Sequence, residues 1–381
     1  MEVRFIEERD NPGLIELSRK TPMEGVISAY TERAPDYFAF YNLHGVNVQT
    51  LTREQRDSGK YDMWTAAVAE DEGKIVGVMS AAAKGVNFGG QPIRIGYIMD
   101  ARVDPEYRRR GLTKQIGIKF VEDAGAEWYD CVIGYILRGN EKAVKGITEG
   151  GRGIFMGKKG GTYTMYQLSM YRPYWVPDAP AIERATEKDK AEIIDLLAEF
   201  YRPYNFSPIF TEEKFDRMLQ VTLGYSYRDF RVVRESGRIV ALIGLWDQTP
   251  VRQVVVMRNT PVIRLGITIA KFLRLFFKAP RPPVEGQPMR SLYIKHIACR
   301  PGCTTVLKKM LKVITNEVRR TGQYHFIWGA FFQADPLLGL FKGLTKTELK
   351  SDMFFGPWNT SWTADAEKIG TQPAYADFSL V

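Results

Sequence analysis

The chain has 381 residues, of which 45% are hydrophobic and 25% are charged. This composition is typical of a globular protein with an ordinary core, and it excludes collagen-like and low-complexity classes. The length is enough for two domains with full cores. The formal charge of +9 suits a polyanionic cofactor or partner. The chain carries no recognised nucleic-acid motif, which argues against nucleic acid as that partner.

The chain has three cysteines, Cys131, Cys299 and Cys303. They form no disulfide framework, which fits a reducing compartment. The N-terminus shows no signal-peptide pattern, so we expect a cytoplasmic protein. His296 lies close to Cys299 and Cys303 in the sequence, but the spacing matches no established zinc pattern. We therefore expect no metal site.

The first elements predict a mixed α/β domain. Val3–Glu8 has the apolar content of a short strand, and Leu14 and Leu17 begin a helical stripe. Further on, apolar runs flank an acidic turn in residues 68–77, where Gly73 supplies the turn residue. This pattern predicts a β-hairpin.

Residues 93–140 form the most informative segment. Apolar residues fall at every second position on a predicted strand, which is the period of one buried face: Ile93, Ile95, Tyr97, Met99, Ala101 and Val103. Apolar residues then recur every fourth position on a predicted helix: Leu112, Ile116, Phe120, Ala124 and Trp128. Cys131–Leu137 predicts a second strand, which completes a β-α-β order.

The turn between this strand and this helix is basic and contains a glycine. It reads Arg108-Arg109-Arg110-Gly111-Leu112-Thr113. The first helical turn has free N–H donors and the positive end of the helix dipole. Gly111 has no Cβ, so a phosphate oxygen can approach the backbone closely. The turn is thus a candidate pyrophosphate site. The alternative is a solvated basic turn before a surface helix.

These residues resemble the acyl-CoA motif of the GCN5-related N-acetyltransferase (GNAT) superfamily. The motif is Gln/Arg-x-x-Gly-x-Gly/Ala preceded by Val-x-Pro, and Val103-Asp104-Pro105 and Arg108–Thr113 match it. Thr113 replaces the last small residue. The resemblance implies acetyl-CoA as co-substrate. It also implies cofactor contacts from these residues: Ala101, Arg102, Val103, Arg108, Arg109, Arg110, Gly111, Leu112, Thr113 and Lys114.

Two further positions extend the resemblance. Asn140 and Ala143 are similar to the family's Asn-x-x-Ala pair, which borders the pantetheine arm of the cofactor. Family members often have a tyrosine seven residues after this asparagine, where it can protonate the leaving CoA sulfur. Ile147 occupies that position here. We therefore expect the catalytic acid to be absent or supplied from elsewhere.

Transfer to an amine requires a general base, and the leaving thiolate requires a proton donor. Asp100 is the best local base candidate because it lies on the cofactor strand just ahead of the turn. Its alternative role is that of an exposed or ion-paired carboxylate. Tyr135 and Tyr97 are candidate proton donors, with burial in the core as the alternative. A backbone N–H near Ala101 can stabilise the oxyanion.

The second half repeats the order of elements in the first. Ile182–Asp189 predicts a strand and a capped helix start, and residues 232–240 predict the same hairpin with Gly237. Leu292–Arg300, Thr304–Arg320 and Tyr324–Phe332 then predict strand, helix and strand. This order predicts two copies of one domain.

We therefore expect an α/β (α+β) fold of two tandem GNAT-like domains, each a mixed, mostly antiparallel sheet flanked by helices. The predicted boundaries are 1–172 for the acyl-CoA-binding domain, 173–180 for a proline-bearing linker and 181–381 for the second domain. The turn Arg300–Thr305 is too short for the motif. The second domain is accordingly expected to be degenerate and to support the first.

An insertion at 251–290 has no counterpart in the first half. It contains eight Lys or Arg residues and one acid, Glu285. Residues 261–278 predict a helix that is apolar almost all round, and we expect it to be buried between the domains or in a dimer. The alternative is a basic amphipathic segment on an anionic membrane or an apolar substrate.

The resemblance implies an acyl-CoA-dependent N-acyltransferase that transfers an acetyl group to a small-molecule amine, a peptide or a protein. The alternative is a non-catalytic acyl-CoA-binding sensor or scaffold, which the isoleucine at 147 allows. The tandem order is also similar to that of plant Hookless-type N-acetyltransferase-like proteins. The similarity to those proteins is clearest where Asn140–Val144 of this chain leads into the Gly-rich segment Gly150–Gly153.

Overall fold

The computed structural model describes residues 1–23, 27–124, 129–148, 157–259, 261–357 and 366–380. Trp128 and the Gly-rich segment Gly150–Gly153 lie outside these ranges. In the first half the strands are β1 (Glu2–Phe5), β2 (Ile27–Glu32), β3 (Val46–Asn47), β4 (Met63–Asp71), β5 (Lys74–Phe88), β6 (Gln91–Val103), β7 (Cys131–Leu137) and β8 (Lys158–Ser169). The helices are α1 (Asn11–Lys20), α2 (Phe38–Asn42), α3 (Arg53–Asp57), α4 (Leu112–Ala124) and α5 (Glu141–Thr148).

The second half continues with the same kinds of element. Its strands are β9 (Glu183–Arg184), β10 (Ser207–Pro208), β11 (Phe230–Glu235), β12 (Arg238–Asp247), β13 (Gln253–Asn259), β14 (Ser291–Cys299), β15 (Phe326–Phe332) and β16 (Lys346–Pro357). Its helices are α6 (Lys190–Tyr201), α7 (Glu212–Val221), α8 (Pro261–Leu273), α9 (Thr304–Thr321) and α10 (Ala366–Thr371).

The two predicted hairpins are confirmed. β4 pairs with β5 and β11 pairs with β12, both antiparallel. Each turn has two residues with positive φ: Glu72 and Gly73 in the first hairpin, Ser236 and Gly237 in the second. This backbone matches the right-handed twist of the flanking strands, which is why the turn ends in glycine.

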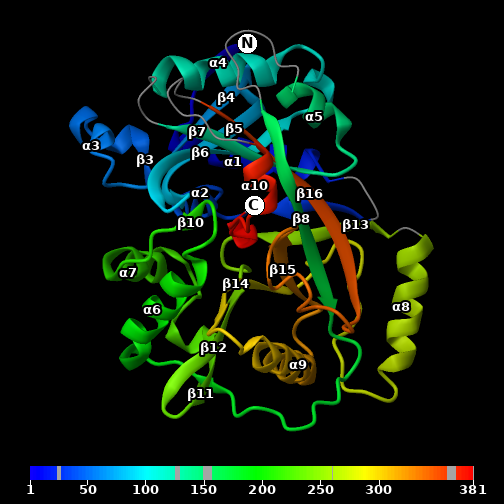
Figure 1. Ribbon diagram of the computed structural model, residues 1–381. Helices are drawn as coiled ribbons and strands as arrows, with labels where there is room; N and C mark the ends of the chain where they lie inside the picture. Colours follow the sequence, from blue (N-terminus) through cyan, green and yellow to red (C-terminus); the bar gives the residue numbers. More distant parts are fainter. Residues whose placement is uncertain (24–26, 125–128, 149–156, 260, 358–365, 381) are drawn as a thin grey trace.

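The predicted β-α-β units are also confirmed. β6 and β7 are parallel and are joined by α4, while β14 and β15 are parallel and are joined by α9. In the first half, α1 and α4 bury their apolar residues in separate core clusters. In the second half, α6 and α9 do the same. In each half, helices thus cover both faces of the strands (Figure 1).

The two halves share one sheet, with strand order β1-β4-β5-β6-β7-β16-β8-β15-β14-β12-β11-β9. β16, from the end of the second half, lies between β7 and β8. β8, from the end of the first half, pairs in turn with β15. The halves therefore exchange their last strands. One core cluster contains residues of α1, α2, α6 and α7 and so spans both halves.

The strict alternation predicted for β6 breaks at Asp100. A β-bulge places Asp100 and Ala101 opposite a single residue of β5, and Asp100 has φ of 55°. The bulge shifts the side-chain alternation, as such insertions do. Ala101, which we expected on the buried face, is exposed, whereas the Asp100 side chain is 3% exposed.

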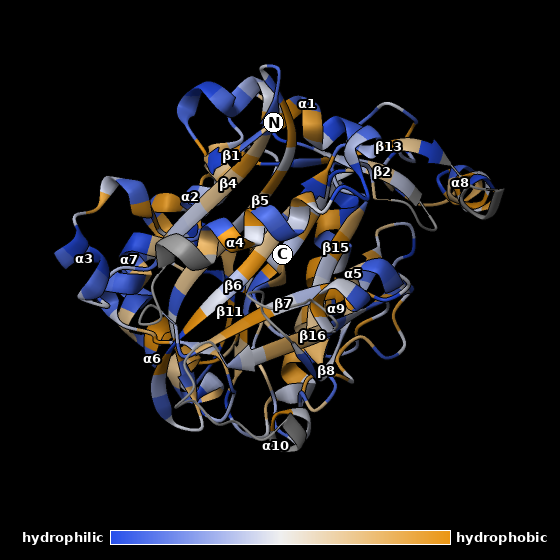
Figure 2. Ribbon diagram, turned by 90° about the horizontal axis from the view of Figure 1, so that it is seen from above, coloured by the Kyte–Doolittle hydropathy of each residue, from blue (hydrophilic) through white to orange (hydrophobic). Residues whose placement is uncertain are grey.

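The insertion differs from expectation in two ways. Its β13 pairs with β2 of the first half in a separate two-stranded sheet, which the sequence did not indicate. The helix itself is confirmed as α8, but burial between the halves is wrong. Leu265, Phe272 and Phe276 are all more than half exposed, and α8 projects from the body of the molecule (Figures 1 and 2). Within the described ranges, no helix is both long and apolar enough to cross a bilayer.

Candidate functional site: an open turn and a cavity between the halves

The strands β6 and β7 separate where the predicted cofactor site begins. They are paired from Ile95 with Cys131 to Ile98 with Gly134, and they diverge after that point. β6 stays paired with β5 up to Val103, with the bulge at Asp100. Ala101 is exposed although it lies on an inner strand of the sheet. The opening between the two strands leaves main-chain groups of β6 unpaired on that side.

The basic turn lies at the end of β6. Asp104 is buried and caps it, accepting a hydrogen bond from the amide of Glu106 at 3.1 Å. Arg109 and Gly111 have φ of 67° and 73°, and α4 starts at Leu112. In the described part of the chain, no atom lies within 4 Å of the position that a Cβ on Gly111 would take. The turn is therefore open, and the first amides of α4 have no partner within the helix.

The arginines of the turn differ in their contacts. Arg108 donates to the carbonyl of Val103 at 3.3 Å, and Arg110 donates to the carbonyl of Glu106 at 3.2 Å. Both stay exposed, as do Arg109, Thr113 and Lys114. Arg102 differs because its guanidinium bonds Asp100 and Thr21. Only the main chain of Arg102 is thus available to a ligand at the turn.

Asp100 is the centre of a buried polar cluster. Its carboxylate accepts hydrogen bonds from Arg33 at 2.7 Å, from Arg102 at 2.6 Å, and from the hydroxyls of Tyr37 and Tyr41 at 2.8 Å each. Burial alone raises the pKa of a carboxyl, but the two guanidinium groups hold the pKa of Asp100 well below its usual range. These contacts favour the ion-paired role for Asp100 over that of a general base.

Tyr135 lies directly after the last residue of β7 that pairs with β6, where these two strands have just separated. Its ring is 5.6 Å from that of Tyr97 and 5.5 Å from those of Tyr163 and Phe378. Burial raises the pKa of Tyr135. The hydroxyl is protonated at neutral pH, and the raised pKa makes it a weaker acid than an exposed tyrosine.

A cavity of about 410 Å³ opens beside Tyr97 and Tyr135. Its walls come from residues 43–45 after α2 and from β5–β7 of the first half, from α7 and β14 of the second half, and from the C-terminal residues 375–380. The charged and aromatic residues that line it are His44, Lys60, Asp62, Lys84, Tyr97, Tyr135, Phe206, Phe210, Glu213, Lys214, Phe215, Arg217, Lys295, His296, Tyr375 and Asp377. A cavity that combines aromatic and aliphatic walls with charged groups of both signs can hold a small polar molecule or the end of a peptide.

His44 and Lys84 are two of the polar residues of this cavity that sequence reasoning missed. His44 is 1% exposed, and neither ring nitrogen has a hydrogen-bond partner among the residues that the structure describes. Burial and the nearby charge of Lys84 lower the pKa of His44 well below its usual value. Burial also lowers the pKa of Lys84 to about 8. A buried polar group without a partner is uncommon in proteins and suggests a ligand contact.

Comparisons with known proteins bear on the domain type and the fold. Residues 34–135 match a family model described as an acetyltransferase (GNAT) domain. This segment contains the turn at 108–113 and ends at Tyr135. The search of curated proteins found no match.

Several solved structures share the fold. N-myristoyltransferase of Saccharomyces cerevisiae with bound myristoyl-CoA has a TM-score of 0.59 at 10% identity, covering 98% of this chain and 84% of that one. A GCN5-related N-acetyltransferase from Anabaena variabilis has a TM-score of 0.50 at 9% identity, covering 94% and 73%. A GCN5-related glucosamine N-acetyltransferase region of a fungal multi-domain β-N-acetylglucosaminidase has a TM-score of 0.57 at 13% identity, covering 93% and 38%.

The chain is a tandem GNAT-fold protein.

In this GNAT fold Asn140 has a clear structural role. Its side-chain oxygen accepts a hydrogen bond from the amide of Ala143 at 3.2 Å, which caps α5. Ile147 has an apolar side chain that cannot donate a proton. Its δ-methyl lies 3.8 Å from the position that a Cβ on Gly134 would take, where β6 and β7 separate. Asn140 and Ala143 remain predicted cofactor contacts.

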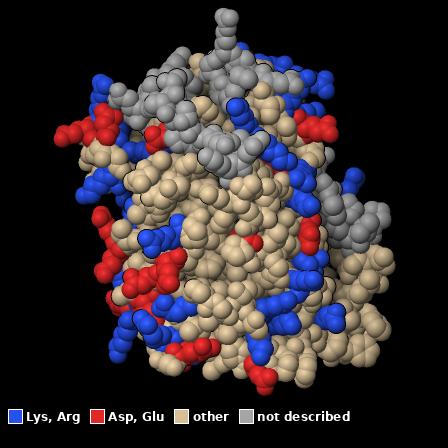
Figure 3. Space-filling view, viewed as in Figure 1, with Lys and Arg blue, Asp and Glu red and all other residues tan. Residues whose placement is uncertain are grey.

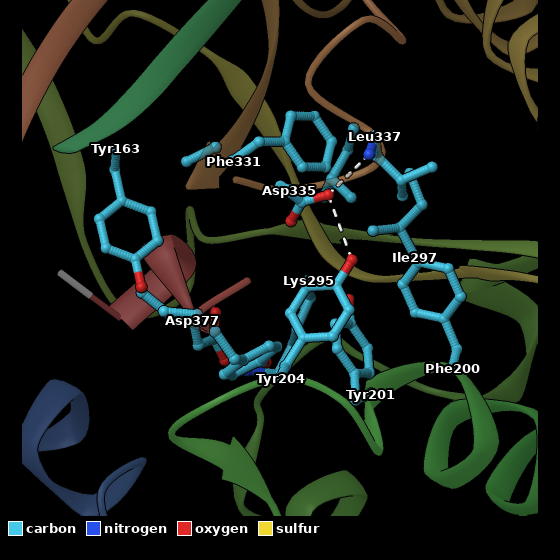
Figure 4. Close-up of a pocket in the computed structure, with 15 residues that line it drawn as sticks. Tyr163, Phe200, Tyr201, Tyr204, Lys295, Ile297, Phe331, Asp335, Leu337 and Asp377 are labelled. Carbon is cyan, nitrogen blue, oxygen red and sulfur yellow. Dashed lines mark hydrogen bonds and ion pairs between the residues drawn. The ribbon is translucent and has the colours of Figure 1, made fainter. Parts of the chain in front are cut away.

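The corresponding opening in the second half is nearly filled. β14 and β15 are paired only from Ser291 to Tyr293 and, like β6 and β7, are unpaired beyond that point. Here, however, Leu337 and Phe341 are buried beside the strands. The cavity that remains is about 30 Å³, the space of about one water molecule. Figure 4 shows Asp335 in this cavity, with Tyr204 and the amide of Leu337 donating to it at 3.2 and 2.7 Å.

We predict that Asp100→Asn destabilises the fold by about 3–5 kcal/mol, because it leaves Arg33 buried beside a neutral partner. Chemical denaturation measures the free energy of unfolding. The control is Asp57→Asn, since Asp57 and Arg53 form an exposed pair at 3.6 Å. This control is expected to cost less than about 1 kcal/mol. Equal effects of the two variants would contradict a structural role for Asp100.

Burial raises the pKa of Asp335 to about 6, against about 3.9 in an unfolded chain. The folded state thus holds a proton that the unfolded state has lost, and stability falls as pH rises from about 4 to 6. We predict that Asp335→Asn is more stable than the parent at pH 7.5, on the order of 2 kcal/mol, with no difference near pH 4.

Urea unfolding at the two pH values measures this difference. Asp195→Asn is the control, because Asp195 is exposed on α6, and its effect should stay within about 0.5 kcal/mol at both pH values. Parallel stability curves for Asp335→Asn and the parent would rule out a raised pKa at this site.

Proposed function

We propose that this protein is an acyl-CoA-dependent N-acyltransferase that transfers an acetyl group from acetyl-CoA to an amine. The observation that carries the proposal is the open turn at 108–114 beside the separated strands β6 and β7. The diphosphate of CoA would bind the first amides of α4, with the exposed Arg108, Arg109 and Lys114 adding positive potential. Asn140 and Ala143 would border the pantetheine arm.

The acyl group would pass through the opening between β6 and β7 and reach the cavity. Tyr135 follows the point of separation and also lines the cavity. An acceptor amine would enter the cavity from between the two halves. The cavity walls contain aromatic side chains and charged side chains of both signs. Such walls suit a small amine or the end of a peptide. The filled opening between β14 and β15 supports cofactor binding in the first half alone.

In the proposed reaction the amine nitrogen attacks the thioester carbonyl, a C–N bond forms and the C–S bond breaks. We assign the role of proton acceptor to His44, which stays neutral at neutral pH because burial lowers its pKa, and whose ring nitrogens have no partner among the described residues. Its ring lies 5.9 Å from that of Tyr97. Tyr135 would protonate the CoA thiolate in place of the tyrosine that family members often have at the position of Ile147. A main-chain amide near Ala101 would bind the oxyanion. Asp100 is a positioning residue that holds the bulge.

A second candidate is a non-catalytic acyl-CoA sensor or scaffold. The isoleucine at 147 favours it, because this side chain packs towards Gly134 and has no proton to donate. Both candidates require acyl-CoA binding at the turn, and only the first requires turnover.

We predict that Gly111→Val weakens acetyl-CoA binding at least about tenfold. A β-branched residue is strained at φ of 73° and would fill the open space above the turn. Isothermal titration gives the dissociation constant. Gly237→Val is the matched control: Gly237 has φ of 79°, lies in the second hairpin, and also has nothing within 4 Å of its Cβ position. The same loss of affinity in both variants would show that the turn is not the site.

We predict that His44→Asn lowers turnover by about 10²-fold or more while acetyl-CoA affinity is kept, because the amine loses its proton acceptor. Release of free CoA thiol against a panel of small amines and peptide N-termini measures turnover. His325→Asn is the control, since His325 lies outside the cavity and bonds the carbonyl of Arg281. Equal turnover of the two variants would contradict the role of His44. Tight acetyl-CoA binding by the parent protein without thiol release for any amine would favour the sensor.

A further inference from the structure

The helix α8 stands apart from the rest of the molecule. It follows β13, and its backbone hydrogen bonding continues past Leu273, with the amide of Phe277 donating to the carbonyl of Leu273 at 2.9 Å. Figure 2 shows α8 at the edge of the fold, with β13 and β2 between it and the first half. Of the residues 264–278, Ala270 is the one with a buried side chain.

Five large apolar side chains form an exposed patch on α8 and the turn after it. Their exposed fractions are 63% for Leu265, 52% for Ile269, 59% for Phe272, 77% for Leu275 and 66% for Phe276. At about 100° per residue, these positions cover one sector of the helix. The rings of Phe272 and Phe276 are 5.2 Å apart and pack on each other. Scattered exposed apolar residues are normal, but a contiguous patch marks an interaction surface.

A basic sector borders the apolar patch. Arg264, Lys271 and Arg274 follow one another around the helix by the same periodicity, Lys278 comes just after the last helical hydrogen bond, and all four are exposed. From Thr249 to Val284 the sequence contains no acidic residue. Figure 3 shows α8 as a largely uncharged bulge with Lys and Arg side chains along its inner border. The helix therefore has three sectors: an exposed apolar one, an exposed basic one, and one that faces the rest of the protein and contains Ala270.

This arrangement selects among possible occupants of the patch. In a symmetric dimer through α8 the same patch would meet itself, and the basic sector would find no acidic partner there, since residues 249–284 contain no acid. An anionic bilayer surface complements both sectors at once, because acyl chains accept the apolar side chains and headgroups attract the basic ones. α8 is too short and too charged to span the bilayer, so it would lie along the surface.

We propose that residues 264–278 dock the protein on an anionic lipid surface. Leu265, Phe272 and Phe276 would enter the boundary between headgroups and acyl chains, and Lys271 and its basic neighbours would contact lipid phosphates. β13 pairs with β2, and Arg33 follows directly after β2. Docking through α8 would therefore hold the first half, which carries the cofactor turn, close to the membrane.

Co-sedimentation of the full chain with lipid vesicles tests the proposal. We expect binding to phosphatidylcholine vesicles that contain about a third phosphatidylglycerol, weak binding to phosphatidylcholine alone, and loss of binding as salt rises. The double variant Phe272→Ser/Phe276→Ser should reduce partitioning about tenfold or more. Trp175→Ser is its control, because Trp175 is 84% exposed in the linker.

Charge reversal tests the basic sector separately. Lys271→Glu should weaken binding to the anionic vesicles several-fold, whereas Lys188→Glu, an exposed lysine outside α8, should have little effect. Light scattering after size exclusion gives the oligomeric state of each variant. Two results would overturn the proposal: no binding to anionic vesicles by the parent protein, or a parent dimer that the Phe272→Ser/Phe276→Ser variant converts to a monomer without any change in vesicle binding.

Discussion

The separation of β6 from β7 is the constraint on which the rest of the site depends. Parallel strands that stayed paired to their ends would leave no path from the turn to the cavity. A bulge at Asp100 accompanies the separation, and its left-handed backbone is costly for a residue other than glycine, by about 1–3 kcal/mol. Hydrogen bonds from Arg33, Arg102 and two tyrosines to the Asp100 carboxylate offset this cost.

The exchange of strands makes the two halves one structural unit. β16 completes the sheet beside β7, and β8 completes the sheet beside β15. The cavity is bounded by both halves, and the ion pair between Lys295 and Asp377 at 2.8 Å fixes the C-terminal tail in its wall. The second half thus contributes structure to the site, whether or not it binds a ligand of its own. The insertion adds a further link, since β13 pairs with β2 just before Arg33.

Local patterns predicted the elements well, and long-range contacts limited the prediction. The hairpins and the β-α-β units follow from turn glycines and from apolar periodicity, which are local properties. The exchange of β16 and the pairing of β13 with β2 join residues far apart in the sequence, and no local signal reports them. The bulge at Asp100 was missed because alternation assumes a regular strand.

The candidate site was predictable only in part, for similar reasons. The turn at 108–113 is a contiguous motif and could be found directly. His44 follows an aromatic run in a short loop, and only the fold brings it beside Tyr97. α8 is apolar on most of its circumference, a pattern typical of a buried helix. Its exposure follows from the fact that the insertion packs through β13 and leaves the helix outside the core.

Hydrogen–deuterium exchange with and without acetyl-CoA tests the central claim most directly. If main-chain amides of the basic turn bind the diphosphate, the ligand should slow exchange across residues 108–114 and leave residues 300–306 of the second half unchanged. Protection at 300–306 with no change at 108–114 would contradict the account.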